Sequence, residues 1–219
     1  MPSSDGELTI LKDTFLDVNE GESIAIIGQS GSGKSTLLGL LAGLDQSSSG
    51  DIHIFGKNIS KMDEEGRALI RKEYISFIFQ NFQLLPSLTA LENVILPLQL
   101  KQVENAKERA LELLDKVGLS HRITHTPKQL SGGEQQRVAI ARAFACQTQI
   151  LFADEPTGNL DSNTGETIAD LLFELNEQYN LTLVLVTHDH KLANRCDKQF
   201  RMDAGVLTQV TTNDKEAHA

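Results

Sequence analysis

A stretch near the start of the chain has the composition and spacing of a phosphate-binding loop. Residues 28–36 read Gly-Gln-Ser-Gly-Ser-Gly-Lys-Ser-Thr and lie between apolar runs at 24–27 and 37–44. A glycine-rich turn after a strand lets consecutive backbone N–H groups point at a phosphate, and the dipole of the following helix adds positive charge. The expected ligand is therefore a polyphosphate.

The residue types within this loop predict how it binds. Lys34 would reach the outer phosphates, the Ser35 hydroxyl would ligate Mg²⁺, and the glycines would let the backbone approach the ligand closely. An ordinary glycine-serine loop is the alternative, but it would require neither a preceding strand nor a following helix. The predicted nucleotide-binding residues of the loop are Gly28, Gln29, Ser30, Gly31, Ser32, Gly33, Lys34, Ser35 and Thr36.

Two adjacent carboxylates end another apolar run. Asp154 and Glu155 follow residues 150–153, Ile-Leu-Phe-Ala. If this run is a strand beside the phosphate loop, Asp154 can hold Mg²⁺, directly or through water, and Glu155 can polarise an attacking water. Pairs of surface acids are common, so this pair indicates a metal site only in combination with the phosphate loop.

A third feature is a helix start at Ser131. Ser131 and Glu134 have the spacing of a capping box, so the serine hydroxyl and the free N–H groups of Gly132 and Gly133 could face an anion. A capped helix without any ligand would also explain these residues completely. Only the motifs taken together separate the two alternatives.

In their order along the chain, these stretches resemble the motifs of the ATP-binding cassette (ABC) ATPases, and the resemblance covers nearly the whole sequence. The motifs are Walker A at 28–36, the Q-loop glutamine Gln80, the signature at 130–134, Walker B at 150–154, the catalytic glutamate Glu155, the D-loop at 159–161 and the switch histidine His188. A chance match to this series in this order is negligible. The resemblance implies the P-loop ATPase fold and ATP hydrolysis.

In that family ATP is bound between two copies, so the resemblance also implies a homodimer with nucleotides at the interface. Walker A of one chain would face Ser131, Gly132 and Gly133 of the other, and Asp161 of the D-loop would contribute to nucleotide binding. The implied catalytic residues are Glu155, His188, Lys34 and Gln80. The implied Mg²⁺ ligands are Ser35, Gln80 and Asp154.

Further stretches narrow the resemblance to the group that contains LolD, MacB and FtsE. They are residues 79–80, 84–86, 91–94 and 154–161, while 62–65, 131–144 and 169–172 are most similar to the YbbA branch of that group. This implies an integral membrane permease of the MacB, LolC or YbbP type as partner, and a position on the cytoplasmic face of the inner membrane. A coupling helix of the permease would occupy a groove near 80–92. The alternative within the family is a regulatory cassette of envelope or division machinery that moves no substrate.

The composition agrees with this interpretation. The 219 residues carry a formal net charge of −10 and 40% hydrophobic side chains, which fits one large α/β domain or two small ones and disfavours a free-standing nucleic-acid binder. We expect no signal peptide, and the apolar run at 37–44 is too short to cross a bilayer. Cys146 and Cys196 lack metal-site spacing and are expected as reduced thiols.

Hydrophobic periodicity and turn residues predict alternating strands and helices, the pattern of a mostly parallel sheet flanked by helices. The expected strands are at 23–27, 51–55, 75–79, 150–153 and 181–186, with a terminal hairpin at 200–210 turning at 203–205 and mixed strand and turn at 8–18. The expected helices are at 34–42, 63–72, 91–100 with an interruption at Pro97, 104–117, 132–145 and 164–179.

Combined with the resemblance, this order of elements implies a single α/β ABC ATPase domain over residues 1–219. Its parts would be a RecA-like core at about 1–80 and 132–210, a helical subdomain at about 81–131, a small antiparallel β part, and a tail at 211–219.

One family feature has no counterpart in the sequence. Relatives carry an aromatic residue well before the phosphate loop that stacks on adenine, and this position falls at about Met1. Phe15 is too close to Gly28 for that geometry, and the N-terminal strand of the family has no counterpart either. Because stacking contributes only about 1 kcal/mol and the phosphates dominate binding, we expect weaker affinity and base selectivity rather than lost function.

Overall fold

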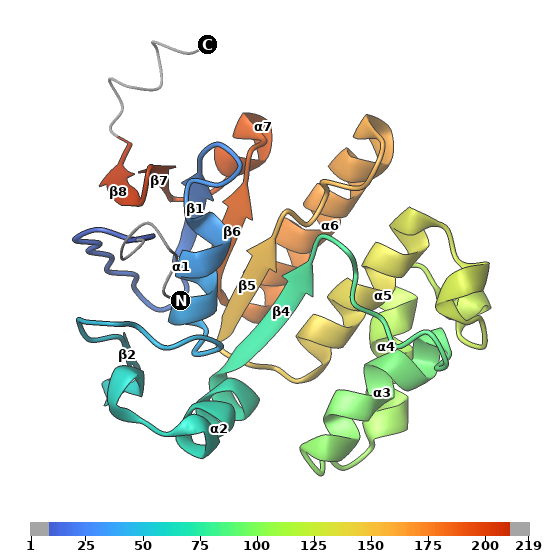
Figure 1. Cartoon of the computed structure of the whole chain (residues 1–219). Helices are drawn as coiled ribbons and strands as arrows, with labels where there is room; N and C mark the ends of the chain where they lie inside the picture. The colour runs from blue at the N-terminus through green and yellow to red at the C-terminus, as the bar shows by residue number, and fades with distance from the viewer. Residues whose placement is uncertain (1–8, 211–219) are drawn as a thin grey trace.

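A six-stranded sheet in the order β4-β5-β6-β1-β7-β8 forms the centre of the protein (Figure 1). The computed structural model describes residues 9–210. Neighbouring strands from β4 to β7 are parallel, and β8 is antiparallel to β7. The strands are β1 (Ser23–Ile27), β4 (Ile75–Phe79), β5 (Ile150–Asp154), β6 (Thr182–Thr187), β7 (Lys198–Asp203) and β8 (Val206–Gln209).

Helices cover both faces of this sheet, and each face has its own hydrophobic core. Because side chains alternate between the faces of a strand, Ile24 and Ile26 join the core that includes α1 and α2, whereas Ala25 and Ile27 join the core that includes α3 to α6. In Figure 1, α3 and α4 lie beside α5 at one side of the sheet. The helices are α1 (Lys34–Leu41), α2 (Glu64–Tyr74), α3 (Ala90–Leu100), α4 (Ala106–Lys116), α5 (Gly132–Ala145), α6 (Ser162–Tyr179) and the short α7 (His190–Ala193).

The remaining elements are short. Two-residue strands form a small antiparallel pair, β2 (His53–Ile54) and β3 (Lys57–Asn58). The 3₁₀ turns are η1 (Ile59–Lys61), η2 (Ser120–Arg122) and η3 (Pro127–Gln129). Within residues 9–210, every helix is too short or too polar to span a bilayer.

The register of the parallel strands brings the chemically interesting residues to one edge of the sheet. Phe79 pairs with Asp154, and Asp154 pairs with Val186. The segments that follow β1, β4, β5 and β6 therefore leave the sheet at the same edge, where open α/β sheets bind their ligands. Those segments contain the predicted phosphate loop, Gln80, Glu155 and His188.

Most predicted elements are confirmed, including the terminal hairpin, which turns at Ala204 and Gly205 between β7 and β8. The strand expected within 8–18 is wrong, since the described residues 9–18 contain none. A backbone bond from Lys12 N–H to Gly205 O at 2.8 Å joins this segment to the hairpin turn. The expected aromatic position near Met1 and the tail at 211–219 lie outside the described residues.

The expected interruption of the helix at Pro97 is also wrong, because α3 continues through this residue. Proline removes one backbone donor, but Val94 and Leu98 are fully buried on either side of it, and a capping box formed by Thr89 and Glu92 closes the N-terminus of the helix. Packing and capping together outweigh the loss of a single hydrogen bond.

The two cysteines are unpaired, as expected. Burial raises the pKa of the Cys146 thiol, and burial together with the nearby Asp197 raises the pKa of Cys196 to about 12. Both residues therefore remain thiols at neutral pH.

Candidate functional site

A cavity of about 590 Å³ opens at the carboxyl edge of the sheet, where the predicted residues converge. Its walls come from the 28–36 loop, from the segments after β4, β5 and β6, and from Ile10. The lining residues are Ile10, Gly28, Gln29, Ser30, Gly31, Gly33, Lys34, Ser35, Thr36, Gln80, Asp154, Glu155 and His188. The structure thus gathers most of the predicted site, and it adds Ile10, which the sequence did not indicate.

The loop itself is held by its own lysine. Lys34 is only 8% exposed, and its ammonium group donates to the carbonyl oxygens of Gly28 at 2.8 Å and Gln29 at 2.9 Å. Gly33 has φ of 109°, which strongly favours glycine, and a Cβ at Gly28 would come within 2.3 Å of the Met202 carbonyl oxygen. The glycines therefore set the loop shape, and the cation is already in place at its centre.

Glu155 and His188 form a pair at the far wall of the cavity. The Nδ1 atom of His188 lies 2.9 Å from Oε1 and 2.8 Å from Oε2 of Glu155. Glu155 has a left-handed backbone with φ of 46°, and its N–H donates to the Val186 carbonyl oxygen at 2.8 Å. This conformation costs a non-glycine residue about 1 kcal/mol or more, and it turns the Glu155 side chain from the strand end into the cavity.

Asp154, next to this pair, is in an environment that penalises its charge. Burial raises the pKa of Asp154, the neighbouring Glu155 raises it further, and Lys34 partly offsets both effects. Two adjacent carboxylates and one nearby ammonium group leave a net negative charge, so a further cation would be stabilised there. The oxygen atoms of Ser35, Gln80 and Asp154 are the kind of donor that Mg²⁺ prefers, so the residues present fit that ion.

The predicted signature forms a capped helix start away from this cavity. The Ser131 hydroxyl accepts from Glu134 N–H at 3.3 Å, and a Glu134 carboxylate oxygen accepts from Ser131 N–H at 2.8 Å. This backbone bond, with help from Arg122, lowers the pKa of Glu134 despite its partial burial. Within the described part of the chain, Ser131, Gly132 and Gly133 do not line the 28–36 cavity.

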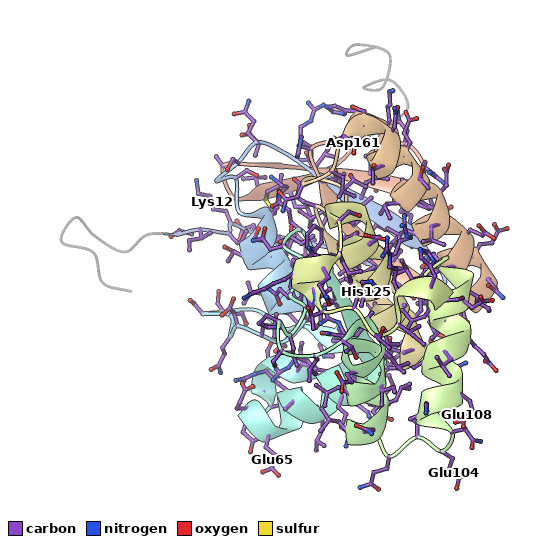
Figure 2. The ribbon with its side chains drawn as sticks, turned by 90° about the vertical axis from the view of Figure 1, so that its right-hand side faces the viewer. Lys12, Glu65, Glu104, Glu108, His125 and Asp161 are labelled. Atoms are coloured by element: carbon purple, nitrogen blue, oxygen red, sulfur yellow. The ribbon has the colours of Figure 1, made fainter. Side chains whose placement is uncertain are left out.

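Asp161 also lies outside the cavity walls. Its carboxylate accepts from Thr164 N–H at 3.1 Å and caps α6, which lowers the pKa of Asp161. It lines a neighbouring groove of about 760 Å³ that shares Glu155 and His188 with the cavity. In Figure 2, Asp161 lies toward the end of the molecule that also carries Lys12, opposite the end with Glu104 and Glu108.

Comparison with known proteins agrees with this arrangement. The family model described as ABC transporter matches residues 11–158. The chain belongs to the ABC transporter family. It is an ATP-binding and ATP-hydrolysing cassette of that family.

The cassette is similar along almost its whole length to curated relatives. It is 54% identical over 205 residues to YbbA of Escherichia coli K12, described as an uncharacterized ABC transporter ATP-binding protein, covering 93% of this chain and 90% of that protein. It is 47% identical over 208 residues to the lipoprotein-releasing system ATP-binding protein LolD of Hahella chejuensis, covering 94% and 90%. The predicted resemblance to the LolD group, and most to YbbA, is confirmed.

A solved structure supports the fold. The dimeric post-hydrolysis structure of the ATP-binding cassette MJ0796 bound to ADP and Pi superposes with a TM-score of 0.87 at 41% identity, covering 96% of this chain and 95% of that one. The predicted α/β ABC ATPase fold, with its mostly parallel sheet and small antiparallel part, is therefore confirmed. The proposed division at residues 80 and 131 stays a prediction.

Arg142, which the sequence did not single out, and Asn159 of the predicted D-loop both contact the segment after β4. The guanidinium group of Arg142 donates to the carbonyl oxygens of Phe82 at 3.0 Å and Gln83 at 2.7 Å. The amide of Asn159 bonds both the backbone and the side chain of Gln80. The D-loop match at 159–161 pointed to the position of Asn159, but no spacing in the sequence predicts its contact with Gln80.

The structure also gives the signature glycine Gly133 a role within its own chain. It is buried, and a Cβ added there would lie 2.6 Å from Cγ2 of Thr164 on α6. We expect Gly133→Ala to lower the free energy of unfolding by about 1–3 kcal/mol, the usual cost of overpacking. Urea unfolding measures this change.

The matched test removes the opposing methyl group. Thr164→Ser lacks Cγ2 and keeps the backbone N–H that Asp161 caps, so the double variant Gly133→Ala/Thr164→Ser is expected to regain most of the lost stability. A Gly133→Ala variant that unfolds at the wild-type urea concentration would show that the packing of α5 against α6 tolerates this methyl.

Proposed function

We propose that the cassette hydrolyses MgATP at a site completed by a second copy and thereby drives a separate integral membrane permease from the cytoplasmic face of the inner membrane. The observation that carries the proposal is the convergence of the 28–36 loop, Gln80, Asp154, Glu155 and His188 on one cavity. The transporter and lipoprotein-releasing relatives favour a transport role over a purely regulatory one.

Each residue of the cavity then has a task that follows from its position. The N–H groups of the 28–36 loop and the Lys34 ammonium would bind the phosphates, while Ser35, Gln80 and Asp154 would hold Mg²⁺. When bound, Mg²⁺ would neutralise charge on the phosphate oxygens. Glu155 would orient the attacking water and take up its proton, and His188, whose side chain is 70% exposed beside Glu155, would contact the γ-phosphate.

The position of the signature supports a composite site. Gly132 and Gly133 present the free N–H groups of a helix start beside the Ser131 hydroxyl, yet all three residues lie outside the cavity of their own chain. A helix N-terminus attracts anions, so a second copy could supply these groups to the bound ATP. The dimeric arrangement of MJ0796, with ADP and Pi bound, supports a homodimer of this kind.

A further groove fits a permease segment, but of the expected 80–92 segment only Gln83 lines it. It measures about 700 Å³ and lies between α2, β4, α3 and α5. Ile75, Phe77, Phe79, Pro97 and Leu100 give it an apolar lining. The basic residues around them are Arg71, Lys72, Lys101 and Arg142.

This groove matches a short amphipathic helix that carries acidic residues, because apolar side chains would fill its floor and carboxylates would meet its basic groups. Burial lowers the pKa of Lys101, so an acidic partner would be favoured there. Since Arg142 also binds the carbonyl oxygens of Phe82 and Gln83, a helix in the groove would touch the segment that carries Gln80. The groove would thereby link the permease to the nucleotide site.

Capture of the permease tests the proposal. Leu100 is 67% exposed in the groove, whereas Leu69 on α2 is 60% exposed and does not line it. Tagged wild-type cassette should capture an integral membrane protein from detergent-solubilised membranes, identified by mass spectrometry. We expect Leu100→Glu to reduce capture about tenfold or more, because a buried apolar anchor contributes 2 kcal/mol or more, and Leu69→Glu to leave it unchanged.

The outcomes separate the possibilities. Equal loss in both leucine variants would remove the groove from the proposal. Capture of the same membrane protein by Leu100→Glu and wild type alike would place the docking surface elsewhere. ATP hydrolysis by purified wild-type cassette, with no membrane protein captured under any condition, would count against the permease.

A further inference from the structure

The loop after β5 holds the Q-loop glutamine through an amide clamp. The Asn159 Nδ2 group donates to the Gln80 carbonyl oxygen at 2.9 Å and to Oδ1 of Asn81 at 2.9 Å. The Asn159 Oδ1 atom accepts from Nε2 of Gln80 at 3.3 Å. Because β4 and β5 are neighbouring parallel strands, this clamp joins the two segments that leave their carboxyl ends side by side.

The hydrogen bonds fix the orientation of both amides. A backbone carbonyl oxygen can only accept, so the side of Asn159 that faces the Gln80 carbonyl must be its NH₂ group. The other side of the amide, Oδ1, then faces Gln80 and requires a donor, which is Nε2. The remaining polar atom of Gln80, Oε1, is left free to serve another group in the cavity that Gln80 lines.

A glycine makes room for this arrangement. A Cβ added to Gly158 would lie 2.8 Å from Nε2 of Gln80 and 3.4 Å from its Cδ. The amide of Gln80 therefore lies directly against the backbone at Gly158, between that glycine and Asn159. Any side chain at position 158 would push the amide out of place.

We propose that Asn159 is a positioning residue that turns the oxygen of the Gln80 amide, rather than its nitrogen, toward the bound metal. The proposal rests on the function proposed above, in which Gln80 is a Mg²⁺ ligand. Only Oε1 of the Gln80 amide can ligate a cation, since the NH₂ group is a donor. Asn159 would contact the ligand Gln80 and not the metal itself. Residues that hydrogen-bond a metal ligand set its orientation and the affinity for the metal.

The test measures the Mg²⁺-dependent gain in nucleotide binding, which needs no turnover. A fluorescent, non-hydrolysable ATP analogue is titrated with the full-length cassette in excess Mg²⁺ and in EDTA. We expect Asn159→Ala to reduce the gain produced by Mg²⁺ about 10-fold, within the range found for residues that support metal ligands. Binding in EDTA should change about twofold or less, because the phosphates still meet the 28–36 loop.

Three further variants separate positioning from general structure. Asn81→Ala removes one bond of the clamp and spares both bonds to Gln80, so it should resemble wild type. Asn159→Asp keeps the acceptor for Nε2 of Gln80 and loses both donors, so its gain should lie between those of wild type and Asn159→Ala. Gly158→Ala leaves Asn159 intact and displaces the Gln80 amide, so it should also reduce the Mg²⁺-dependent gain.

A Gln80→Ala background distinguishes failure of this inference from failure of the proposed function. If Gln80 is the ligand and Asn159 only orients it, Asn159→Ala should have no further effect on the Mg²⁺-dependent gain in that background. An unchanged gain in Gln80→Ala itself would remove Gln80 from the metal site and refute the proposed role. A reduced gain in Gln80→Ala together with a wild-type gain in Asn159→Ala would overturn the inference alone, as would equal effects of Asn159→Ala in both backgrounds.

Discussion

Replacing Glu155 by glutamine is expected to stop ATP turnover, to leave ATP binding intact and to make an ATP-bound dimer accumulate. Glutamine has nearly the same shape and can still accept a hydrogen bond from Nδ1 of His188, which lies 2.8 Å from Glu155. It cannot take a proton from water. General-base catalysis contributes about 100- to 10,000-fold to rate, so the turnover number should fall by an amount in that range.

Accumulation of the dimer follows from the charge that the substitution removes. Asp154 and Glu155 are adjacent, and burial together with repulsion from Glu155 raises the pKa of Asp154. The γ-phosphate of ATP would bring further negative charge to this wall of the cavity. Removing the Glu155 charge lowers that repulsion while hydrolysis, the step that would open the dimer, no longer occurs.

Size-exclusion chromatography with MgATP and a phosphate-release assay measure the two effects. The matched control is Glu166→Gln, because Glu166 is 72% exposed, pairs with Lys191 at 3.7 Å and does not line the 28–36 cavity. It should hydrolyse ATP and elute as wild type does. A Glu155→Gln protein that remains monomeric in MgATP and hydrolyses it at the wild-type rate would refute the assigned role.

The sequence predicted the cavity well because its residues follow buried parallel strands. Runs such as 23–27 and 150–153 read as continuous apolar segments, which is what strands covered on both faces require. Once such strands are parallel, the residues after them must meet at one edge. The positions of Lys34, Asp154 and Glu155 follow from chain order and that single rule.

Contacts between loops could not be predicted in the same way. The clamp between Asn159 and Gln80 joins residues 79 positions apart in the sequence, and neither residue has a periodic pattern around it. The same holds for Ile10, which reaches the cavity from a segment that the sequence assigned partly to a strand. Such contacts depend on how irregular segments are arranged in the tertiary structure, which local sequence propensity does not predict.

The signature shows a different limit. Its capping box was readable from Ser131 and Glu134, and the structure confirms it. Within one chain, Ser131 lies outside the cavity. Contacts within a single chain therefore do not show which anion this helix start could bind. Only the family resemblance assigned these residues to nucleotide binding, and that assignment stays a prediction for the dimer.

Lys34→Ala is expected to have the largest effect on nucleotide affinity. The ammonium group is 8% exposed and lies at the centre of the loop that would bind the phosphates. A hydrogen bond to a charged group contributes about 1.5–3 kcal/mol, and a lysine that meets the outer phosphates makes more than one. Binding of ATP should therefore weaken about 100-fold or more, as measured by isothermal titration calorimetry.

The substitution should also loosen the loop before any nucleotide arrives. Lys34 donates to the carbonyl oxygens of Gly28 and Gln29, and the Gln29 oxygen otherwise has a longer bond from Ser32 N–H, at 3.3 Å. Amides of residues 28–33 should then exchange hydrogen faster in the Lys34→Ala protein than in wild type, with little change in the strands. This readout separates loss of a cation from loss of loop shape, because a variant that lost only the cation would exchange at the wild-type rate.

The control removes the same charge without touching the loop. Lys12 is exposed, and its backbone N–H, not its side chain, binds Gly205 at 2.8 Å. Lys12→Ala lowers the net charge as much as Lys34→Ala does, so it should reproduce any effect of overall charge on ATP affinity. Equal weakening of ATP binding in both variants would mean that the overall charge of the cassette attracts ATP. The buried position of Lys34 would then contribute nothing specific to phosphate binding.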